Sequence, residues 1–134
     1  MDVFQIAAWF VKKEPMNHLK LQGLVYLAYF WYERKYQKAL FDTRGYEALP
    51  MMPTEPELAR KYQNYGQKKI RSLSAKMPPK AIQRFLKQIY ETYGMADGEA
   101  LASYLRQNEA YQKARQRQTD YMICREDMRT NDQK

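Results

Sequence analysis

The sequence predicts a mainly α-helical protein that folds as a compact, single-domain helical bundle. Apolar side chains recur at intervals of three and four residues through several segments, which is the spacing of one helix face. The chain has 134 residues, of which 45% are hydrophobic and 14% are aromatic, so one domain can bury a substantial core. Long runs of alternating apolar and polar residues, which would predict strands, are almost missing.

Two helices are expected at the beginning of the chain. Asp2 is a suitable N-cap for the first, which ends at Glu14 because Pro15 disfavours a helical conformation of the residue before it. Asn17 is a suitable N-cap for the second, which extends to about Tyr36. The second helix is apolar on nearly all sides and is therefore expected at the centre of the domain.

Residues 41–56 are expected to form an ordered loop, because prolines interrupt the segment at positions 50, 53 and 56. A PxxP recognition motif is the alternative, but Pro56 is better explained as a proline in the first turn of a helix. Thr54 and Glu57 match a T-x-x-E capping box, and the helix that follows is expected to end at Tyr65 with Gly66 as its left-handed stop.

The second half of the chain predicts three further helices. Residues 67–77 are expected to form a short helix or a turn. The clearest amphipathic helix follows the proline pair 78–79 and ends at Gly94, and shorter helices begin after Asp97 and Asn108. A small β element near residues 45–49 and 120–124 also fits the pattern. The domain is expected to span residues 1–128, with residues 129–134 as a polar C-terminal tail.

Positive charge is concentrated in the middle of the chain. The formal net charge of +8 arises from 23 Lys and Arg residues against 15 Asp and Glu residues. The segment 58–90 has no acidic residue, and its basic residues are Arg60, Lys61, Lys68, Lys69, Arg71, Lys76, Lys80, Arg84 and Lys87. Attraction to an acidic protein, a nucleic acid or an anionic surface is one interpretation, and a solvated helix face is the other.

Residues suited to catalysis or metal binding are few. The chain has one cysteine, Cys124, and one histidine, His18, which together cannot provide a disulfide or a Cys/His zinc site. The five glycines are scattered singly, so no phosphate-binding loop is expected. We therefore expect no enzymatic activity, no metal and no cofactor.

The longest apolar run, residues 23–32, is shorter than the roughly 20 residues that cross a bilayer. No secretory signal is recognised at the N-terminus. A cytoplasmic protein without a membrane span is therefore expected.

Tyrosine is unusually frequent, with twelve residues. Its large apolar ring and hydroxyl group suit both a core edge and a protein-recognition surface. From their helical phase, some tyrosines are expected to be partly exposed and to form an aromatic and basic patch with nearby cations: Tyr62, Tyr65, Tyr104 and Tyr111 with Arg60, Lys61 and Arg115. Stacking of single-stranded bases on such a patch is an alternative.

Three sequence blocks resemble a known family. Residues 16–32, MNHLKLQGLVYLAYFWY, and then ALF at 39–41 resemble the Panacea domain of SocA-like antitoxins and GepA-like phage-associated proteins, whose pattern is KLQKLxYYAxxWY followed by PLF. Residues 46–66 are similar to the family's FEAWxYGPVxPELYxxxxxYG block, with IYETYG at 89–94 matching its VYxxYG. Residues 101–115 resemble its LSxLTHxxxPWxxAR block.

This chain is a divergent example of that pattern. Gly23 replaces a usual lysine, and Leu49 and Met52 stand where tryptophan and glycine are expected. Leu105-Arg106 and Ala110-Tyr111 occupy the Thr-His and Pro-Trp positions.

The resemblance implies an antitoxin that binds and neutralises a toxin protein, in some members as a protease adaptor. It implies no enzymatic activity. The alternative is a nucleic-acid-binding or phage-associated regulatory protein that uses the basic segment 58–90. We expect the toxin to contact the segments 46–66 and 104–115, through Met51, Met52, Arg60, Lys61, Tyr62, Tyr65, Tyr104, Arg106, Tyr111 and Arg115.

Overall fold

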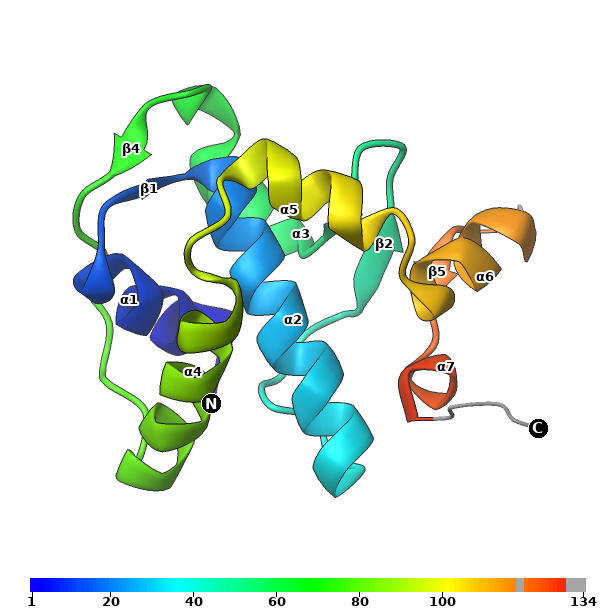
Figure 1. The fold of residues 1–134 in the computed structure, drawn as a ribbon, viewed down its shortest axis with the longest axis horizontal. Coiled ribbons are helices and arrows are strands. Elements are labelled where there is room, and N and C mark those ends of the chain that lie inside the picture. Colours follow the sequence, from blue (N-terminus) through cyan, green and yellow to red (C-terminus); the bar gives the residue numbers. More distant parts are fainter. Residues whose placement is uncertain (118–119, 130–134) are drawn as a thin grey trace.

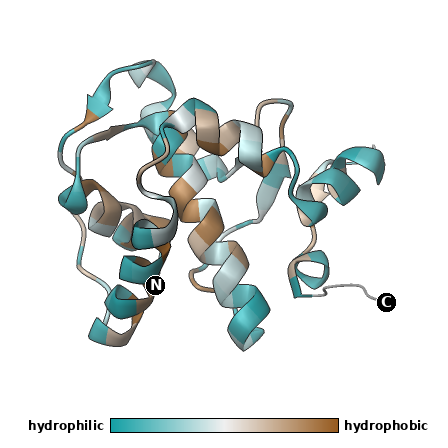
Figure 2. Cartoon of the chain, viewed as in Figure 1, coloured by the Kyte–Doolittle hydropathy of each residue, from teal (hydrophilic) through white to brown (hydrophobic). Residues whose placement is uncertain are grey.

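The computed structural model, which describes residues 1–117 and 120–129, is mainly helical, as the sequence predicts (Figure 1). Helix α2 (His18–Tyr36) runs through the middle of the structure, and the other elements surround it (Figure 1). Leu24, Val25 and Tyr26 in its centre are fully buried. Figure 2 shows hydrophobic residues in the middle of α2 and hydrophilic residues in its last turns. The expected central helix is therefore confirmed.

Most of the other helices pack directly against α2. Their bounds are α1 (Val3–Lys13), α3 (Pro56–Tyr62), the 3-10 helix η1 (Gln63–Tyr65), α4 (Lys80–Tyr93), α5 (Gly98–Leu105), α6 (Glu109–Arg117) and α7 (Arg125–Arg129). Four predicted N-caps are confirmed, because each side-chain oxygen accepts a hydrogen bond from a backbone N–H three residues later: Asp2, Asn17, Asp97 and Asn108.

Two small antiparallel sheets complete the fold. In the first, β1 (Met16–Asn17) pairs with β4 (Lys69–Ile70), with Met16 opposite Ile70. In the second, β2 (Tyr46–Ala48) lies between β3 (Pro53–Thr54) and β5 (Met122–Ile123). The expected β element near residues 45–49 and 120–124 is therefore confirmed.

The predicted start of α3 is wrong by one residue. Glu55, not Thr54, is the N-cap, because its Oε1 accepts the Leu58 N–H at 2.8 Å. The Thr54 hydroxyl donates to the Met52 carbonyl instead. Pro56 occupies the first turn as expected. Gly66 follows η1 with φ +59°, a conformation that favours glycine.

The segment 67–77 contains a strand, not the expected helix or turn. Ile70 is 1% exposed and lies opposite Met16, which is also buried. A strand of two residues is too short to leave a periodic pattern of apolar residues in the sequence. The conformation of this segment is determined instead by its pairing with β1, which is distant in the chain.

A short helix, α7, includes Arg129, the first residue of the expected polar tail 129–134. Its Arg125 and Arg129 are bound to the buried Glu33 of α2, at 2.7 and 2.6 Å. Arg129 therefore belongs to the domain and not to the tail. Residues 130–134 of the predicted tail lie outside the described residues.

Candidate partner-binding surface

The loop between β2 and β3 presents apolar side chains to solvent. Leu49 and Met51 are 40% and 56% exposed, although the antiparallel strands on both sides of the loop are largely buried. A single exposed apolar side chain would be ordinary, but two large ones on one short loop mark a candidate interaction surface.

Three side chains from the α5–α6 region hold the backbone of this loop. Arg106 Nη1 donates to the Met51 carbonyl at 2.8 Å, and Arg115 Nη1 donates to the Ala48 carbonyl at 2.9 Å. The Tyr111 hydroxyl lies within hydrogen-bond distance of the Leu49 and Pro50 carbonyls. Every carbonyl from residue 48 to residue 51 therefore has a side-chain partner. We refer to residues 48–52 with these bonds as the pinned loop.

A pocket of about 320 Å³ lies beside the pinned loop. The loop contributes Leu49, Met51 and Met52, and the start of α2 contributes His18, Leu19 and Gln22. Burial lowers the pKa of His18, so its imidazole is neutral at physiological pH. The described lining residues therefore carry no formal charge, which suits an apolar or neutral group of a partner.

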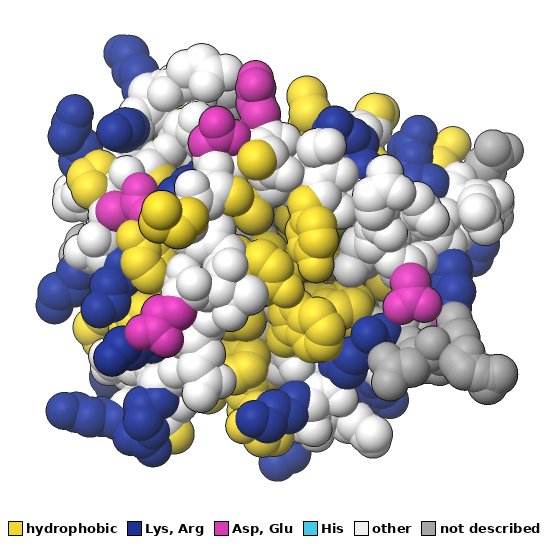
Figure 3. Space-filling model, in the orientation of Figure 1, with side chains coloured by type: hydrophobic (Ala, Val, Ile, Leu, Met, Phe, Trp, Pro, Cys, Tyr) yellow, Lys and Arg dark blue, Asp and Glu magenta, His cyan; other side chains and the backbone are white. Residues whose placement is uncertain are grey.

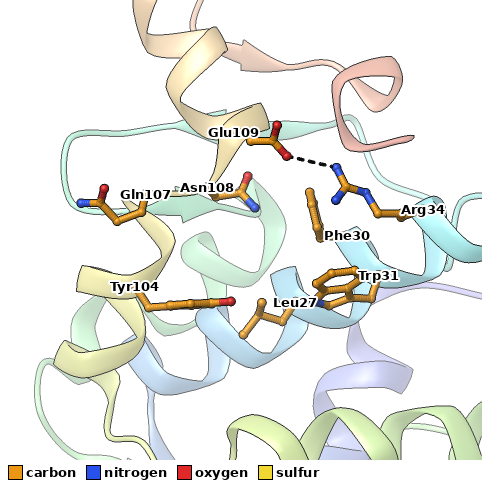
Figure 4. Close-up of a pocket in the computed structure, with 8 residues that line it drawn as sticks. All are labelled: Leu27, Phe30, Trp31, Arg34, Tyr104, Gln107, Asn108 and Glu109. Carbon is orange, nitrogen blue, oxygen red and sulfur yellow. Dashed lines mark hydrogen bonds and ion pairs between the residues drawn. The ribbon is translucent and has the colours of Figure 1, made fainter. Parts of the chain in front are cut away.

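A second hollow of about 200 Å³ lies between α2 and the turn joining α5 to α6 (Figure 4). Figure 4 shows Tyr104 reaching toward Leu27 of α2, with Trp31 beyond it. Tyr104 is 53% exposed, and an ion pair of Glu109 with Arg34 at 3.4 Å closes the far side. Figure 3 shows hydrophobic side chains gathered in the centre of this face of the molecule.

Polar groups around this hollow already have partners within the fold. The Trp31 indole donates to the Tyr93 hydroxyl at 2.9 Å, and the Arg34 guanidinium lies over the Phe30 ring. Asn108 Oδ1 accepts from the Tyr26 hydroxyl at 2.8 Å. The hollow therefore has an apolar and aromatic side, formed by Leu27, Phe30, Trp31 and Tyr104, and a polar side, formed by Arg34, Gln107, Asn108 and Glu109.

The structure joins the two sequence segments expected to contact a partner. Met51 of the first segment and Arg106 of the second are in direct contact. Tyr104 lies on the last turn of α5, two residues before Arg106. Segments about fifty residues apart in the chain therefore contribute to one region of the surface.

The expected exposure is wrong for two tyrosines. Tyr62 and Tyr111 are 3% and 4% exposed, and Met52 is buried as well. Tyr111 turns inward because its hydroxyl binds the pinned loop, and Tyr62 packs against His18. Helical phase alone does not reveal a neighbouring loop that covers one side of a short helix.

The remaining expected contact residues lie on or near α3. Arg60 and Lys61 are exposed, and the Lys61 ammonium lies over the Phe4 ring at 5.7 Å. Tyr65 is 41% exposed, and its ring contacts that of Tyr62. Tyr65 immediately precedes Gly66, which lines the pocket beside the pinned loop.

Sequence reasoning did not single out Leu49 within the expected segment 46–66, and it did not identify His18 or Gln22 as part of this surface. The sequence contained one signal for Leu49. This residue begins the apolar run LPMMP at 49–53, in which prolines are typical of an exposed loop. His18 and Gln22 gave no such signal, because their location beside residue 51 depends on the tertiary fold.

Comparison with protein-family models finds no match for this chain. Searches of the curated proteins and of the solved structures also find no similar protein. Within the described residues, no helix has the length and apolar character to cross a membrane, and no three His, Cys, Asp or Glu side chains gather as a metal site. The assignment of function therefore depends on the residues and their geometry.

Proposed function

We propose that this protein is the antitoxin of a toxin–antitoxin pair, acts in the cytoplasm, and neutralises a cognate toxin protein by direct binding. The observation that carries the proposal is the pinned loop, which holds the exposed Leu49 and Met51 on a fixed backbone. Apolar side chains that are ordered before binding lose little conformational entropy in a complex, so they are suited to be interface anchors.

The sequence blocks support the same proposal. The segments 46–66 and 104–115, which resemble Panacea-domain blocks, contain the pinned loop and the side chains that hold it. Met51 adds a flexible thioether that adapts to an irregular partner surface. A toxin contacted here would have its active region covered by the loop, the adjacent pocket and the exposed Tyr65.

The proposal is tested by isolating the partner. Tagged protein purified from its native cell should retain one stoichiometric protein, identified by mass spectrometry, that arrests growth when expressed alone. Co-expression with the full antitoxin should restore growth. If no co-purifying protein arrests growth, the antitoxin proposal is wrong.

Two matched methionine variants locate the interface. Met51→Asp should weaken toxin binding at least about tenfold, since it places a charge on an apolar anchor. Met95→Asp is the control, because Met95 is 97% exposed in the connection between α4 and α5, away from the pinned loop. Equal binding by both variants would exclude the pinned loop as the contact surface.

Toxin lifetime separates two mechanisms of neutralisation. Direct covering of the toxin predicts inhibition by the purified antitoxin in the absence of any protease. A protease adaptor predicts instead that the toxin remains active in the purified complex and is degraded faster in cells that contain the antitoxin.

A further inference from the structure

A basic groove follows α1 and α4 on a part of the surface separate from the pinned loop. Three adjoining hollows of about 370, 320 and 220 Å³ share lining residues, including Trp9, Lys12 and Met77. The cations that line them are Lys12, Lys13, Arg71, Lys80, Arg84 and Lys87. We refer to these three hollows together as the basic groove.

The cations of the basic groove lack acidic partners within the described part of the chain. No carboxylate forms an ion pair with any of the six, whereas Arg117, Arg125 and Arg129 at the other end of the fold are all paired. The nearby Glu14 is engaged by Lys20 at 3.2 Å and by the Tyr90 hydroxyl. Within the described residues, no acidic side chain is therefore paired with the positive charge of the groove.

The arrangement of the cations is linear. Lys80, Arg84 and Lys87 are spaced by four and three residues, so they form a stripe on one face of α4 about 10 Å long. Lys12 and Lys13 are in the last turn of α1, and Lys13 lines the same hollow as the stripe. Glu91, one turn beyond Lys87, is where the positive stripe ends.

The cations are not spread evenly over the basic groove. Apolar side chains, including the half-buried Leu73 and Met77, line much of the hollow of about 370 Å³. The hollow of about 220 Å³ is instead lined by four cations beside Trp9 and Gln83, and the Lys13 ammonium lies over the Trp9 ring at 5.1 Å. A row of cations of this kind fits a regular series of phosphates, whose binding is driven by release of counterions.

We propose that the basic groove binds the phosphodiester backbone of a nucleic acid without reading its sequence. The proposal is independent of the antitoxin function, which uses the pinned loop. The basic groove differs from the basic segment 58–90 that the sequence indicated. Arg60, Lys61, Lys68 and Lys69 of that segment do not line the groove, whereas Lys12 and Lys13 of α1 do.

Fluorescence anisotropy with labelled oligonucleotides tests the proposal. The probes are single-stranded DNA, duplex DNA and single-stranded RNA of equal length and mixed sequence, titrated with the full chain between low and physiological salt. The dissociation constant should rise linearly with salt on logarithmic axes and should not depend on base sequence. No binding to any of the three probes at low salt would overturn the proposal.

Charge-reversal variants locate the site. The triple variant K80E/R84E/K87E should weaken binding more than about 100-fold at low salt, and the slope of the salt dependence for single-stranded DNA should fall by about 2, since three phosphate contacts are lost. The control K38E/R44E/R60E has the same change in net charge at exposed positions outside the groove, and it should retain affinity within about threefold. Equal losses in the two variants would overturn the groove as the site.

Two further measurements keep the outcomes distinct. K80Q/R84Q/K87Q, which neutralises without reversing charge, should give a smaller loss in the same direction, and circular dichroism should show all variants folded. Polyglutamate is then added as a competitor, and we expect that it does not displace DNA. If polyglutamate displaces DNA at equal charge concentration, the groove binds an acidic protein partner and the proposal is overturned. The groove variants should bind the toxin normally, and M51D should bind DNA normally.

Discussion

Gln22 of α2 binds both backbone polar groups of Glu55, the residue that caps α3. The Gln22 amide nitrogen donates to the Glu55 carbonyl at 3.0 Å, and the Glu55 N–H donates to the Gln22 amide oxygen at 2.9 Å. Both residues are buried, with exposures of 2% and 1%. A single side chain therefore fixes the chain where β3 ends and α3 begins, beside the pinned loop.

Replacing Gln22 by methionine should lower the free energy of unfolding by about 1–3 kcal/mol. The variant keeps the length of the side chain but leaves the buried Glu55 N–H without a partner, at the cost of one unsatisfied buried polar group, whereas the Glu55 carbonyl still accepts the Ala59 N–H at 3.0 Å. Urea unfolding measures the change. Gln88→Met on the exposed face of α4 is the control and should stay within about 0.5 kcal/mol of the parent. A loss below 1 kcal/mol in Gln22→Met would contradict the role assigned to this bond pair.

The Gln22–Glu55 pair also shows where sequence reasoning stops. Apolar periodicity and capping residues were enough to predict the helices and the central position of α2, because both signals are local. The start of α3 was misplaced because Thr54 and Glu57 form a good local capping pattern. The fold instead uses Glu55, which a residue 33 positions earlier in the chain holds in place.

The candidate site was predictable in part for the same reason. The proline-rich loop with its methionines was visible in the sequence, and so was the segment 104–115. Their contact was not, since the bonds from Arg106, Tyr111 and Arg115 to the loop carbonyls join residues more than fifty positions apart. Those bonds turn three expected anchors, Arg106, Tyr111 and Arg115, into supports of the loop.

Two buried tyrosines should respond oppositely to removal of the hydroxyl group. The Tyr26 hydroxyl donates to Asn108 Oδ1 at 2.8 Å, whereas the buried Tyr46 hydroxyl has no hydrogen-bond partner within the described structure. Tyr26→Phe should lower the free energy of unfolding by about 1 kcal/mol, and Tyr46→Phe should raise it by a similar amount, because an unpartnered polar group is removed from the core.

Thermal and urea unfolding of the two phenylalanine variants give the comparison. Each variant is the control for the other, since both rings are buried and both lose the same oxygen atom. A clear loss of stability in Tyr46→Phe would show that its hydroxyl has a partner, such as a buried water molecule, and would contradict the prediction.

Gly98 allows the first turn of α5 to approach the first turn of α2. A Cβ atom at this position would lie 2.9 Å from the Lys20 backbone nitrogen and 3.0 Å from Asn17 Oδ1, the two atoms of the α2 N-cap bond. Gly98→Ala should therefore cost about 1–3 kcal/mol, because backbone atoms cannot move aside as a side chain can.

Gly23→Ala is the matched comparison for Gly98→Ala. Its Cβ would meet the Leu101 side chain at 3.1 and 3.2 Å, and that side chain can shift slightly. Alanine in the middle of α2 also gains up to about 1 kcal/mol in helix propensity, so the net loss should be smaller. If Gly23→Ala proves the more damaging of the two in urea unfolding, the explanation from the fixed backbone contact is wrong.

Glu33 should make the stability of the protein depend on pH in the acid range. Its side chain is fully buried, yet α7 supplies Arg125 Nε at 2.7 Å and Arg129 Nε at 2.6 Å. Burial alone would raise the pKa of Glu33, but the hydrogen bonds and charges of the two arginines outweigh it and lower the pKa below 4.5. The ionised form is therefore favoured by folding, and its contribution is complete above the unfolded pKa.

Glu33→Gln removes the charge and nearly keeps the shape, so it should cost about 2–3 kcal/mol at pH 7, the strength of hydrogen bonds to a charged group. As the pH falls through the folded pKa, the parent protonates and loses the same contribution. The difference between parent and variant should then shrink toward zero once the pH lies below the folded pKa. Glu91→Gln, an exposed carboxylate on α4, is the control and should differ little from the parent at any pH. Urea unfolding at a series of pH values measures both variants, and a Glu33→Gln difference that does not shrink at any acid pH at which the parent remains folded would show that charge does not hold α7 against α2.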